Sequence, residues 1–250
     1  MSNSFFRFKQ FIIRQDKCAM KVTTDACLFG AWLAEKVRSQ ESGVGSQNLK
    51  VGNVLDIGTG TGLLSLMLAQ NCDANIDAIE IDDQAAAQAT ENEEACSFRN
   101  SIQVINADIR DHHFEKKYDV IISNPPFYEN ELKSVSSKKN IAHHGENLSL
   151  QDLLTAIKQN LNPGGLFFLL LPFKRDEEIR SLVYQNKMQL KQITLVRQSV
   201  HHNFFRIMIM GTITEEGYSE AEFDEISIWD EHQQYTEEFV QLLKDYYLYL

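Results

Sequence analysis

Glycine takes three alternating positions in the segment Gly58-Thr59-Gly60-Thr61-Gly62, which follows the apolar run Val51–Ile57. A strand that enters such a turn and leaves it as a helix presents backbone N–H groups and a helix N-terminus at its carboxyl end. In open α/β sheets, this is the edge where ligands bind. The segment therefore predicts an α/β sheet that holds a nucleotide-like ligand at one edge. A tight turn without a ligand is the structural alternative.

Strand and helix patterns alternate through the rest of the chain. We expect strands at Val51–Ile57, Ile76–Ile81, Ile102–Asn106, Tyr118–Ser123, Leu166–Leu171, Gln189–Arg197 and Phe204–Thr212, and helices at Gly62–Gln70, Gln84–Cys96, Leu150–Leu161, Asp176–Asn186 and Tyr235–Tyr247. Such alternation predicts a mostly parallel, seven-stranded sheet with helices on both faces. The last two strands follow each other closely, which predicts an antiparallel strand at one edge.

The acidic residues around the glycine turn indicate which cofactor it holds. The dinucleotide fingerprint requires a third glycine at Leu63, whereas this chain has it at Gly62. Asp56 would repel a pyrophosphate but suits an amino group. Glu80 ends the next strand, where a carboxylate can accept both ribose hydroxyls, and Asp108 follows the third strand and can approach an adenine amino group. An acidic pocket of this kind favours S-adenosylmethionine over NAD.

A second motif, Asn124-Pro125-Pro126-Phe127, ends the strand expected at Tyr118–Ser123. Methyl transfer to an exocyclic amine requires the nitrogen lone pair to leave the π system of the ring. The Asn124 side-chain oxygen and the Pro125 carbonyl can each accept one N–H bond, and two prolines fix the backbone. Phe127 offers a face on which a flat base can stack, worth about 1–3 kcal/mol. This chemistry requires no metal. A proline turn that only ends the strand is the structural alternative.

Charge and composition limit the classes of partner and the cellular compartment that we expect for this protein. The formal net charge is −11, but eleven acids and one base lie between Ile207 and Leu250, so the acidity is local and does not exclude RNA. Residues 1–24 carry a net +4. The longest apolar stretch, Leu166–Leu171, is too short for a membrane helix, and no signal peptide or cysteine pair for zinc is visible. We therefore expect a cytoplasmic protein, with no membrane partner and no metal site at the paired histidines.

The two motifs together resemble those of the class I amino methyltransferases. The segments Phe8-Lys9-Gln10-Phe11, Lys21-Val22-Thr23-Thr24-Asp25, Gly30-Ala31-Trp32, Gln234-Tyr235 and Tyr246-Tyr247-Leu248 resemble one branch, the bacterial methyltransferases that modify N6 of adenine 37 in a valine tRNA. The resemblance implies a Rossmann-like fold, S-adenosylmethionine as cofactor and the tRNA anticodon stem-loop as partner; we expect a monomer. Many relatives have tyrosine where this chain has Phe127, which keeps the stacking face but loses a hydroxyl.

The resemblance also implies which residues form the site. The catalytic set is Asn124, Pro125, Pro126 and Phe127, and the cofactor-binding set is Thr24, Asp25, Asp56, Gly58, Gly60, Gly62, Glu80, Ile81, Asp108, Ile109 and Asn124. Residues 1–38 are expected to form a strand and helix extension that covers the cofactor, with Thr24 and Asp25 over its methionine end. Residues 39–50 are expected to be a linker, and residues 51–250 the methyltransferase domain with a flap at 128–148.

Three other functions stay open at this stage. N5-glutamine methylation of a protein suits the same Asn-Pro-Pro motif, but it would call for a helical N-terminal domain, and only a short segment precedes the turn. N2-guanine methylation of rRNA shares both motifs, and the N-terminal segment and the C-terminal tyrosines favour tRNA over it. An RNA-binding module without activity is disfavoured because every residue that the chemistry needs is present.

Overall fold

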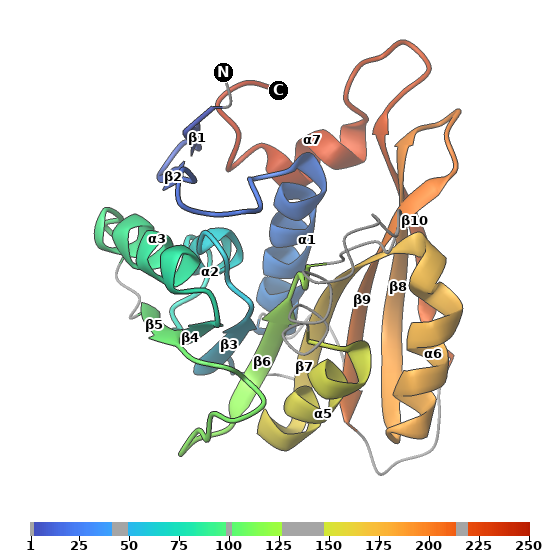
Figure 1. The fold of residues 1–250 in the computed structure, drawn as a ribbon. Helices are drawn as coiled ribbons and strands as arrows, with labels where there is room; N and C mark the ends of the chain where they lie inside the picture. The colour runs from blue at the N-terminus through green and yellow to red at the C-terminus, as the bar shows by residue number, and fades with distance from the viewer. Residues whose placement is uncertain (1–2, 42–49, 99–101, 127–147, 214–219) are drawn as a thin grey trace, which may run out of the picture.

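The centre of the molecule is an eight-stranded sheet, shown by a computed structural model that describes residues 3–41, 50–98, 102–126, 148–213 and 220–250 (Figure 1). In order across the sheet, the strands are β10 (Glu222–Trp229), β8 (Met188–Ser199), β9 (Phe204–Ile213), β7 (Leu161–Pro172), β6 (Tyr118–Ser123), β3 (Asn53–Ile57), β4 (Asn75–Glu80) and β5 (Ile102–Asn106). All neighbours pair in parallel except β9, which runs antiparallel to β7 and β8. The predicted α/β fold with a mostly parallel sheet is confirmed.

Two details of the sheet differ from the prediction: it has eight strands rather than seven, and the antiparallel strand β9 lies inside it rather than at an edge. The additional strand, β10, lies in the acidic C-terminal region. Its first four residues are exposed, and only Ile226 and Ile228 are buried. An edge strand needs few apolar residues because it covers the core with one face only. The acid-rich sequence therefore conceals this strand.

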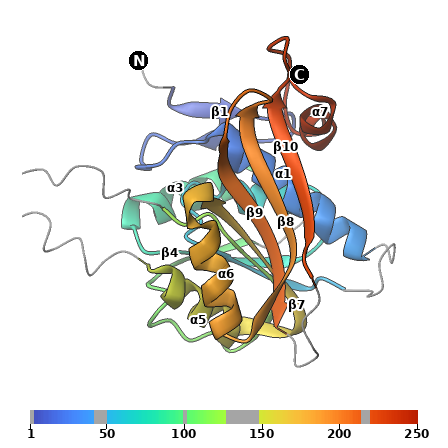
Figure 2. The ribbon, with the colours of Figure 1, turned by 90° about the vertical axis from the view of Figure 1, so that its right-hand side faces the viewer.

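Helices cover both faces of the sheet (Figure 2). They are α1 (Thr24–Glu41), α2 (Leu63–Ala69), α3 (Asp83–Glu94), α5 (Leu150–Asn160), the 3-10 helix η1 (Phe173–Arg175), α6 (Asp176–Gln185) and α7 (Glu237–Leu243). Alternate strand residues point to opposite faces. Val54 accordingly joins the core beneath α1, α2 and α7, and Leu55 joins the core beneath α5 and α6.

The N-terminal residues form a hairpin that packs against the C-terminal residues. Strands β1 (Phe5–Arg7) and β2 (Ile12–Arg14) pair antiparallel. Phe8 forms a β-bridge with Tyr247, and the two aromatic rings lie 6.1 Å apart. The Lys9 backbone N–H donates to the Tyr246 carbonyl at 2.8 Å. The two ends of the chain therefore lie side by side, and the acidic C-terminal region folds against the domain (Figure 1).

The division into extension, linker and domain stays a prediction. Helix α1 runs to Glu41, into the expected linker 39–50, and residues 42–49 of that linker lie outside the described residues. Residues 127–147, which include Phe127 and nearly all of the expected flap, also lie outside them. None of the helices in the described ranges combines the length and apolar character needed to cross a membrane.

Candidate active site

The two motifs predicted to act together lie side by side at the carboxyl edge of the sheet. Ile57 of β3 pairs with Ile79 of β4 on one side and with Ser123 of β6 on the other. The next residues along the three strands, Gly58, Glu80 and Asn124, therefore lie at the same level of this edge, and Glu80 is the last residue of β4. Neighbouring strands are about 4.8 Å apart, so Gly58 stands between the other two at roughly one strand spacing from each.

The glycine turn has a backbone that only glycine adopts without strain. The φ angles of Gly58, Gly60 and Gly62 are 71°, 56° and 80°, in the region that a Cβ atom disfavours. A Cβ on Gly58 or Gly60 would meet no described atom within 4 Å, so these two border open space. A Cβ on Gly62 would instead lie 3.6 Å from Ala89, so Gly62 packs against α3. Of the three glycines, Gly58 and Gly60 therefore have open space where a Cβ atom would lie.

Asp56 lies fully buried behind the turn. Its Oδ2 accepts hydrogen bonds from the hydroxyls of Thr59 and Ser65, both at 2.7 Å. Its Oδ1 has no partner within the described part of the chain. Burial raises the pKa of this carboxyl to about 6, although the two hydroxyl donors oppose the shift. A buried acceptor without a donor is costly, so this oxygen fits the amino group that the sequence assigns to it.

Glu80 links the second strand to the turn. Its Oε2 accepts the Gly60 backbone N–H at 2.9 Å, and its Oε1 accepts the Asp82 backbone N–H at 3.0 Å. A carboxylate can accept about four hydrogen bonds, so sites for two ribose hydroxyls remain. Ile81, the next residue, is 50% exposed, which leaves apolar surface beside this carboxylate. The cofactor-binding role of both residues stays a prediction.

Asp108 and Ile109 follow β5 at the same edge, but both side chains already contact other residues of the chain. The Arg110 Nε donates to both Asp108 oxygens at 3.0 and 2.9 Å, and hydrogen bonding by this guanidinium lowers the pKa of Asp108. The predicted contact with an adenine amino group would have to share the carboxylate with Arg110. Ile109 is only 9% exposed and packs into the core beneath α5 and α6.

The Asn-Pro-Pro motif leaves β6 directly beside the turn. The Ser123 hydroxyl donates to the Ile57 carbonyl at 2.8 Å, which ties the two strand ends together. Asn124 is half-buried, Pro125 is buried and Pro126 is exposed. The Asn124 side chain has no hydrogen-bond partner among the residues that the structure places. Its role toward a substrate stays a prediction.

Thr24 and Asp25 open helix α1 near the same edge. Thr24 is exposed, whereas the Asp25 Oδ2 accepts from the Arg206 Nε at 2.7 Å. Arg206 lies opposite Pro172, at the carboxyl end of β7. This ion pair fastens α1 to the sheet beyond the Asn-Pro-Pro motif. The sequence indicates a helix start here but gives no sign of the partner on β9.

Two buried amide side chains near the site, Gln88 and Asn92, were not among the residues predicted from the sequence. Gln88 and Asn92 of α3 are 0% and 1% exposed, and they contact the N-terminal extension; Asn92 also contacts the turn. The signal was present, because both residues follow Ala85 at helical spacing on the face of α3 that otherwise buries alanines. No three His, Cys, Asp or Glu side chains in the described ranges gather as metal ligands.

Solved structures with the same architecture identify the fold. A class I S-adenosylmethionine-dependent methyltransferase from Listeria monocytogenes aligns with a TM-score of 0.61 at 14% identity, over 83% of this chain and 68% of that one. A tRNA m1G37 methyltransferase from M. jannaschii aligns with a TM-score of 0.59 at 13% identity, over 86% and 59% of the two chains. The predicted class I methyltransferase fold is therefore confirmed.

Sequence comparison identifies the family. The model of the methyltransferase small domain matches residues 44–172, which include both motifs. A Dyadobacter fermentans protein named tRNA1(Val) (adenine(37)-N6)-methyltransferase is 39% identical over 249 residues, 98% of each chain. A Parabacteroides distasonis protein of the same name is 37% identical over 250 residues, 99% of each chain. The chain belongs to the methyltransferase small domain family and, within it, to the group of tRNA1(Val) (adenine(37)-N6)-methyltransferases.

Proposed function

We propose that this protein transfers a methyl group from S-adenosylmethionine to N6 of adenine 37 in the anticodon loop of valine tRNA. The near-full-length relatives carry this name. The observation in this chain that carries the proposal is the register that sets Gly58 and Asn124 side by side at the carboxyl edge. A cofactor on the turn and an amine on the Asn-Pro-Pro motif would therefore face each other across one strand spacing.

The residues of the turn fit the cofactor. The unpartnered Oδ1 of Asp56 suits an ammonium group, the free acceptor sites of Glu80 suit ribose hydroxyls, and open space borders Gly58 and Gly60. When bound, S-adenosylmethionine supplies an electrophilic methyl group on a sulfonium. We assign Ile81 to the adenine ring and Thr24 and Asp25 to the cover over the methionine end.

The Asn-Pro-Pro motif would prepare the acceptor nitrogen. The Asn124 Oδ1 and the Pro125 carbonyl would each accept one N–H of the adenine amine, which favours a tetrahedral nitrogen with its lone pair directed at the methyl group. The nitrogen lone pair would then form the new bond to the methyl group as the methyl–sulfur bond breaks with its electron pair left on sulfur, and the methylated nitrogen would release one proton to water. Holding the two reactants in line accounts for much of the rate, because orientation alone can supply several orders of magnitude. Phe127 would stack on the flipped base.

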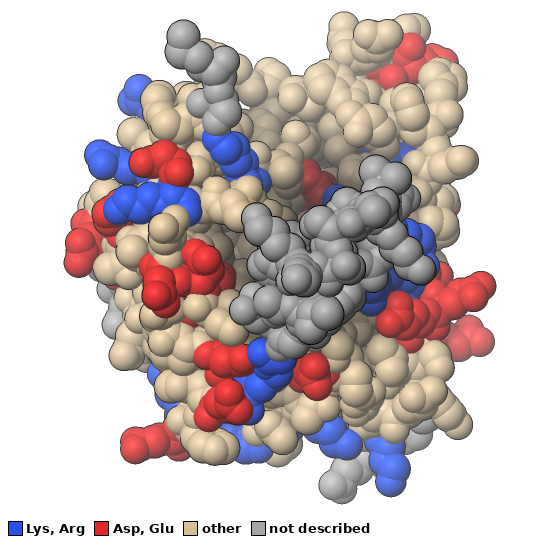
Figure 3. Space-filling model, viewed as in Figure 1, with Lys and Arg blue, Asp and Glu red and all other residues tan. Residues whose placement is uncertain are grey.

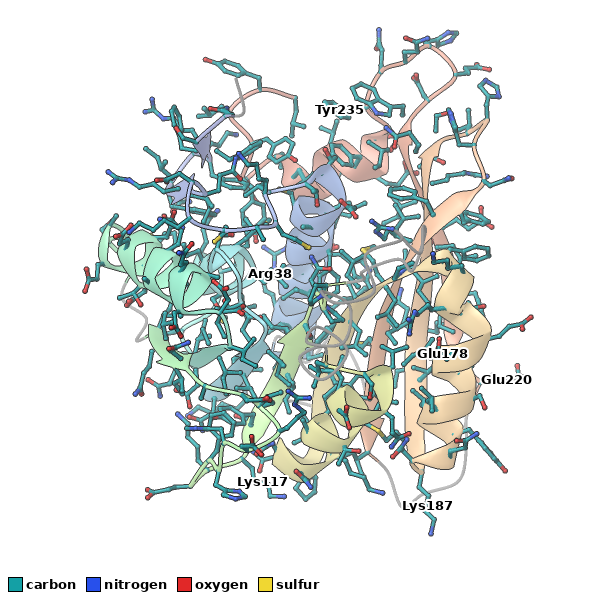
Figure 4. All side chains as sticks on the ribbon, viewed as in Figure 1. Arg38, Lys117, Glu178, Lys187, Glu220 and Tyr235 are labelled. Carbon is teal, nitrogen blue, oxygen red and sulfur yellow. The ribbon has the colours of Figure 1, made fainter. Side chains whose placement is uncertain are left out.

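The charge distribution is compatible with RNA at this edge. The hairpin and the loop that follows it carry Arg7, Lys9, Arg14, Lys17 and Lys21 against the single acid Asp16. Figure 3 shows Lys and Arg side chains over this hairpin, with the acidic side chains of α3 beside them. Lys117 and Lys187 lie at the opposite end of the sheet, far from the site (Figure 4). We propose that the anticodon stem-loop approaches from the hairpin side, and that the protein acts as a cytoplasmic monomer.

Nucleoside analysis tests the proposed function directly. Purified protein is incubated with S-adenosylmethionine and unmodified valine tRNA, and the digested nucleosides are measured by mass spectrometry. We expect N6-methyladenosine from this tRNA and none from a matched transcript with guanine at position 37. Methylation of the guanine transcript at N2, or of neither transcript, would contradict the assignment.

A further inference from the structure

Asn92 joins two parts of the site that are far apart in the sequence. Its Oδ1 accepts the Arg14 backbone N–H at 2.8 Å, and its Nδ2 donates to the Arg14 carbonyl at 2.8 Å. The same Nδ2 donates to the carbonyl of Thr61, inside the glycine turn, at 2.9 Å. Both amide hydrogens are thus used, on a side chain that is 1% exposed. The extension and the turn are bonded to one buried group.

A second buried amide holds the same extension one helical turn away. The Gln88 Oε1 accepts the Lys17 backbone N–H at 3.2 Å, and the Lys17 ammonium pairs with Glu91 at 2.5 Å. Gln88 itself makes no bond to the glycine turn within the described ranges. The extension is therefore anchored to α3 at two points, and only the Asn92 point also reaches the turn.

The loop that follows the anchored residue Arg14 is closed by a side-chain hydrogen bond. Gln15 closes this loop, because its Oε1 accepts the Val22 backbone N–H at 2.8 Å. Cys18, near the middle of the loop, is 9% exposed. Burial, and after it the charges of Glu80 and Asp82, raises the pKa of the Cys18 thiol to about 11. The loop therefore lies within electrostatic reach of the carboxylate that we assign to the ribose.

We propose that Asn92 is a positioning residue that holds the N-terminal extension over the cofactor site by bonding both to Arg14 and to the glycine turn. Cofactor binding and docking of the extension would then reinforce each other. The proposal rests on S-adenosylmethionine being the cofactor. A ligand that holds the turn in this conformation also favours the bonds between Asn92 and Arg14. By thermodynamic linkage, a fastened extension must in turn tighten cofactor binding.

The variant Asn92→Asp tests this link with almost no change in volume. It keeps an acceptor for the Arg14 N–H but places an oxygen against the carbonyls of Thr61 and Arg14. The matched control is Thr90→Val on the same helix, because among the described residues the Thr90 hydroxyl bonds only to Ala86 of α3 itself. Calorimetry with S-adenosylmethionine should show a dissociation constant raised about tenfold in Asn92→Asp and changed less than about twofold in Thr90→Val.

Hydrogen exchange provides the readout that a purely structural role would not alter. In the unmodified protein, S-adenosylmethionine should slow amide exchange in peptides covering residues 12–22 as well as 58–62. In Asn92→Asp the protection should remain at 58–62 and disappear at 12–22. Equal protection of both peptides in the two proteins would overturn the proposal, as would an unchanged dissociation constant in a folded variant.

The unmodified protein alone keeps the proposal testable if Asn92→Asp fails to fold. Cofactor that binds but leaves exchange at 12–22 unaltered would then refute the coupling. These results are separate from the proposed reaction. Cofactor binding with coupled protection but without methylation of tRNA would refute the reaction alone, and methylation without coupled protection would refute the role of Asn92 alone.

Discussion

Replacement of Asp56 by asparagine should stabilise the ligand-free protein while weakening its hold on the cofactor. Asp56 is fully buried, and its pKa rises from 3.8 to about 6 in the folded protein. The folded state thus binds the proton more tightly than the unfolded state. Stability from this group is complete below the unfolded pKa and is lost as the pH rises through the folded pKa. Two pKa units correspond to about 3 kcal/mol, as an order of magnitude.

The pH dependence isolates the charge from every other effect of the substitution. By pH 5 the carboxyl of the unfolded protein has already lost its proton, so the remaining loss of stability runs from pH 5 to the folded pKa. This interval of about one pH unit corresponds to roughly 1.4 kcal/mol, which is lost between pH 5 and pH 8. Asparagine does not titrate. The Tm of the variant minus that of the unmodified protein should therefore increase by about 3–6 °C from pH 5 to pH 8.

Thermal unfolding of both proteins without ligand, at pH 5 and at pH 8, measures this gain. Calorimetry at pH 8 should also show S-adenosylmethionine binding weakened at least about tenfold, because the neutral amide loses the charge-assisted bond to the ammonium. A difference in Tm that stays constant with pH, or that narrows toward pH 8, would refute the reasoning about the buried charge. Unchanged cofactor affinity would refute the assigned contact.

Three further substitutions test the site and the fold. Asn124→Ala should lower the methyl-transfer rate at least about 100-fold, as loss of a transition-state hydrogen-bond partner does, while calorimetry shows cofactor affinity within about twofold; equal loss of both would make Asn124 structural. Glu80→Gln should raise the cofactor dissociation constant about tenfold by calorimetry, because an amide replaces the carboxylate that accepts the Gly60 N–H. An unaltered constant would place the ribose elsewhere. Gly211→Ala should lower the free energy of unfolding by about 3 kcal/mol in urea titrations, because its Cβ would overlap the Phe167 ring and lie 2.7 Å from the Gln189 carbonyl oxygen. A midpoint equal to that of the unmodified protein would disprove this close packing.

The periodicity of apolar residues predicted most strands and helices, because each of these elements depends mainly on residues close together in the sequence. The bounds of Tyr118–Ser123 and Ile102–Asn106 match those of β6 and β5, since apolar residues recur within each short segment at the spacing of a strand. The strand β10 was missed because partners on β8 define it, while acids occupy three of the first four positions of its own sequence. Parallel register, once inferred, brought the two motifs to one edge without any knowledge of side chains.

Side-chain partners across the chain could not be predicted in the same way. The contact between Gly62 and Ala89, for example, depends on how α3 packs against the turn, while the assignment of Gly62 to the cofactor stays a prediction. Asp108 looked free because nothing in the sequence fixes the rotamer with which Arg110 folds back on it. The two bonds of Asn92 to Arg14 join positions whose approach depends on how the extension docks on α3.

The bridge between Phe8 and Tyr247 has a consequence for biosynthesis. A ribosome releases the hairpin first, but its aromatic docking surface includes Tyr247, which emerges after every strand of the sheet. Contacts between positions so far apart in the sequence form late, because closing the long loop between them costs conformational entropy before the contacts stabilise the chain. A growing chain can thus complete its sheet before the hairpin has all of its packing partners, so the hairpin reaches its final position only after Tyr247 has emerged.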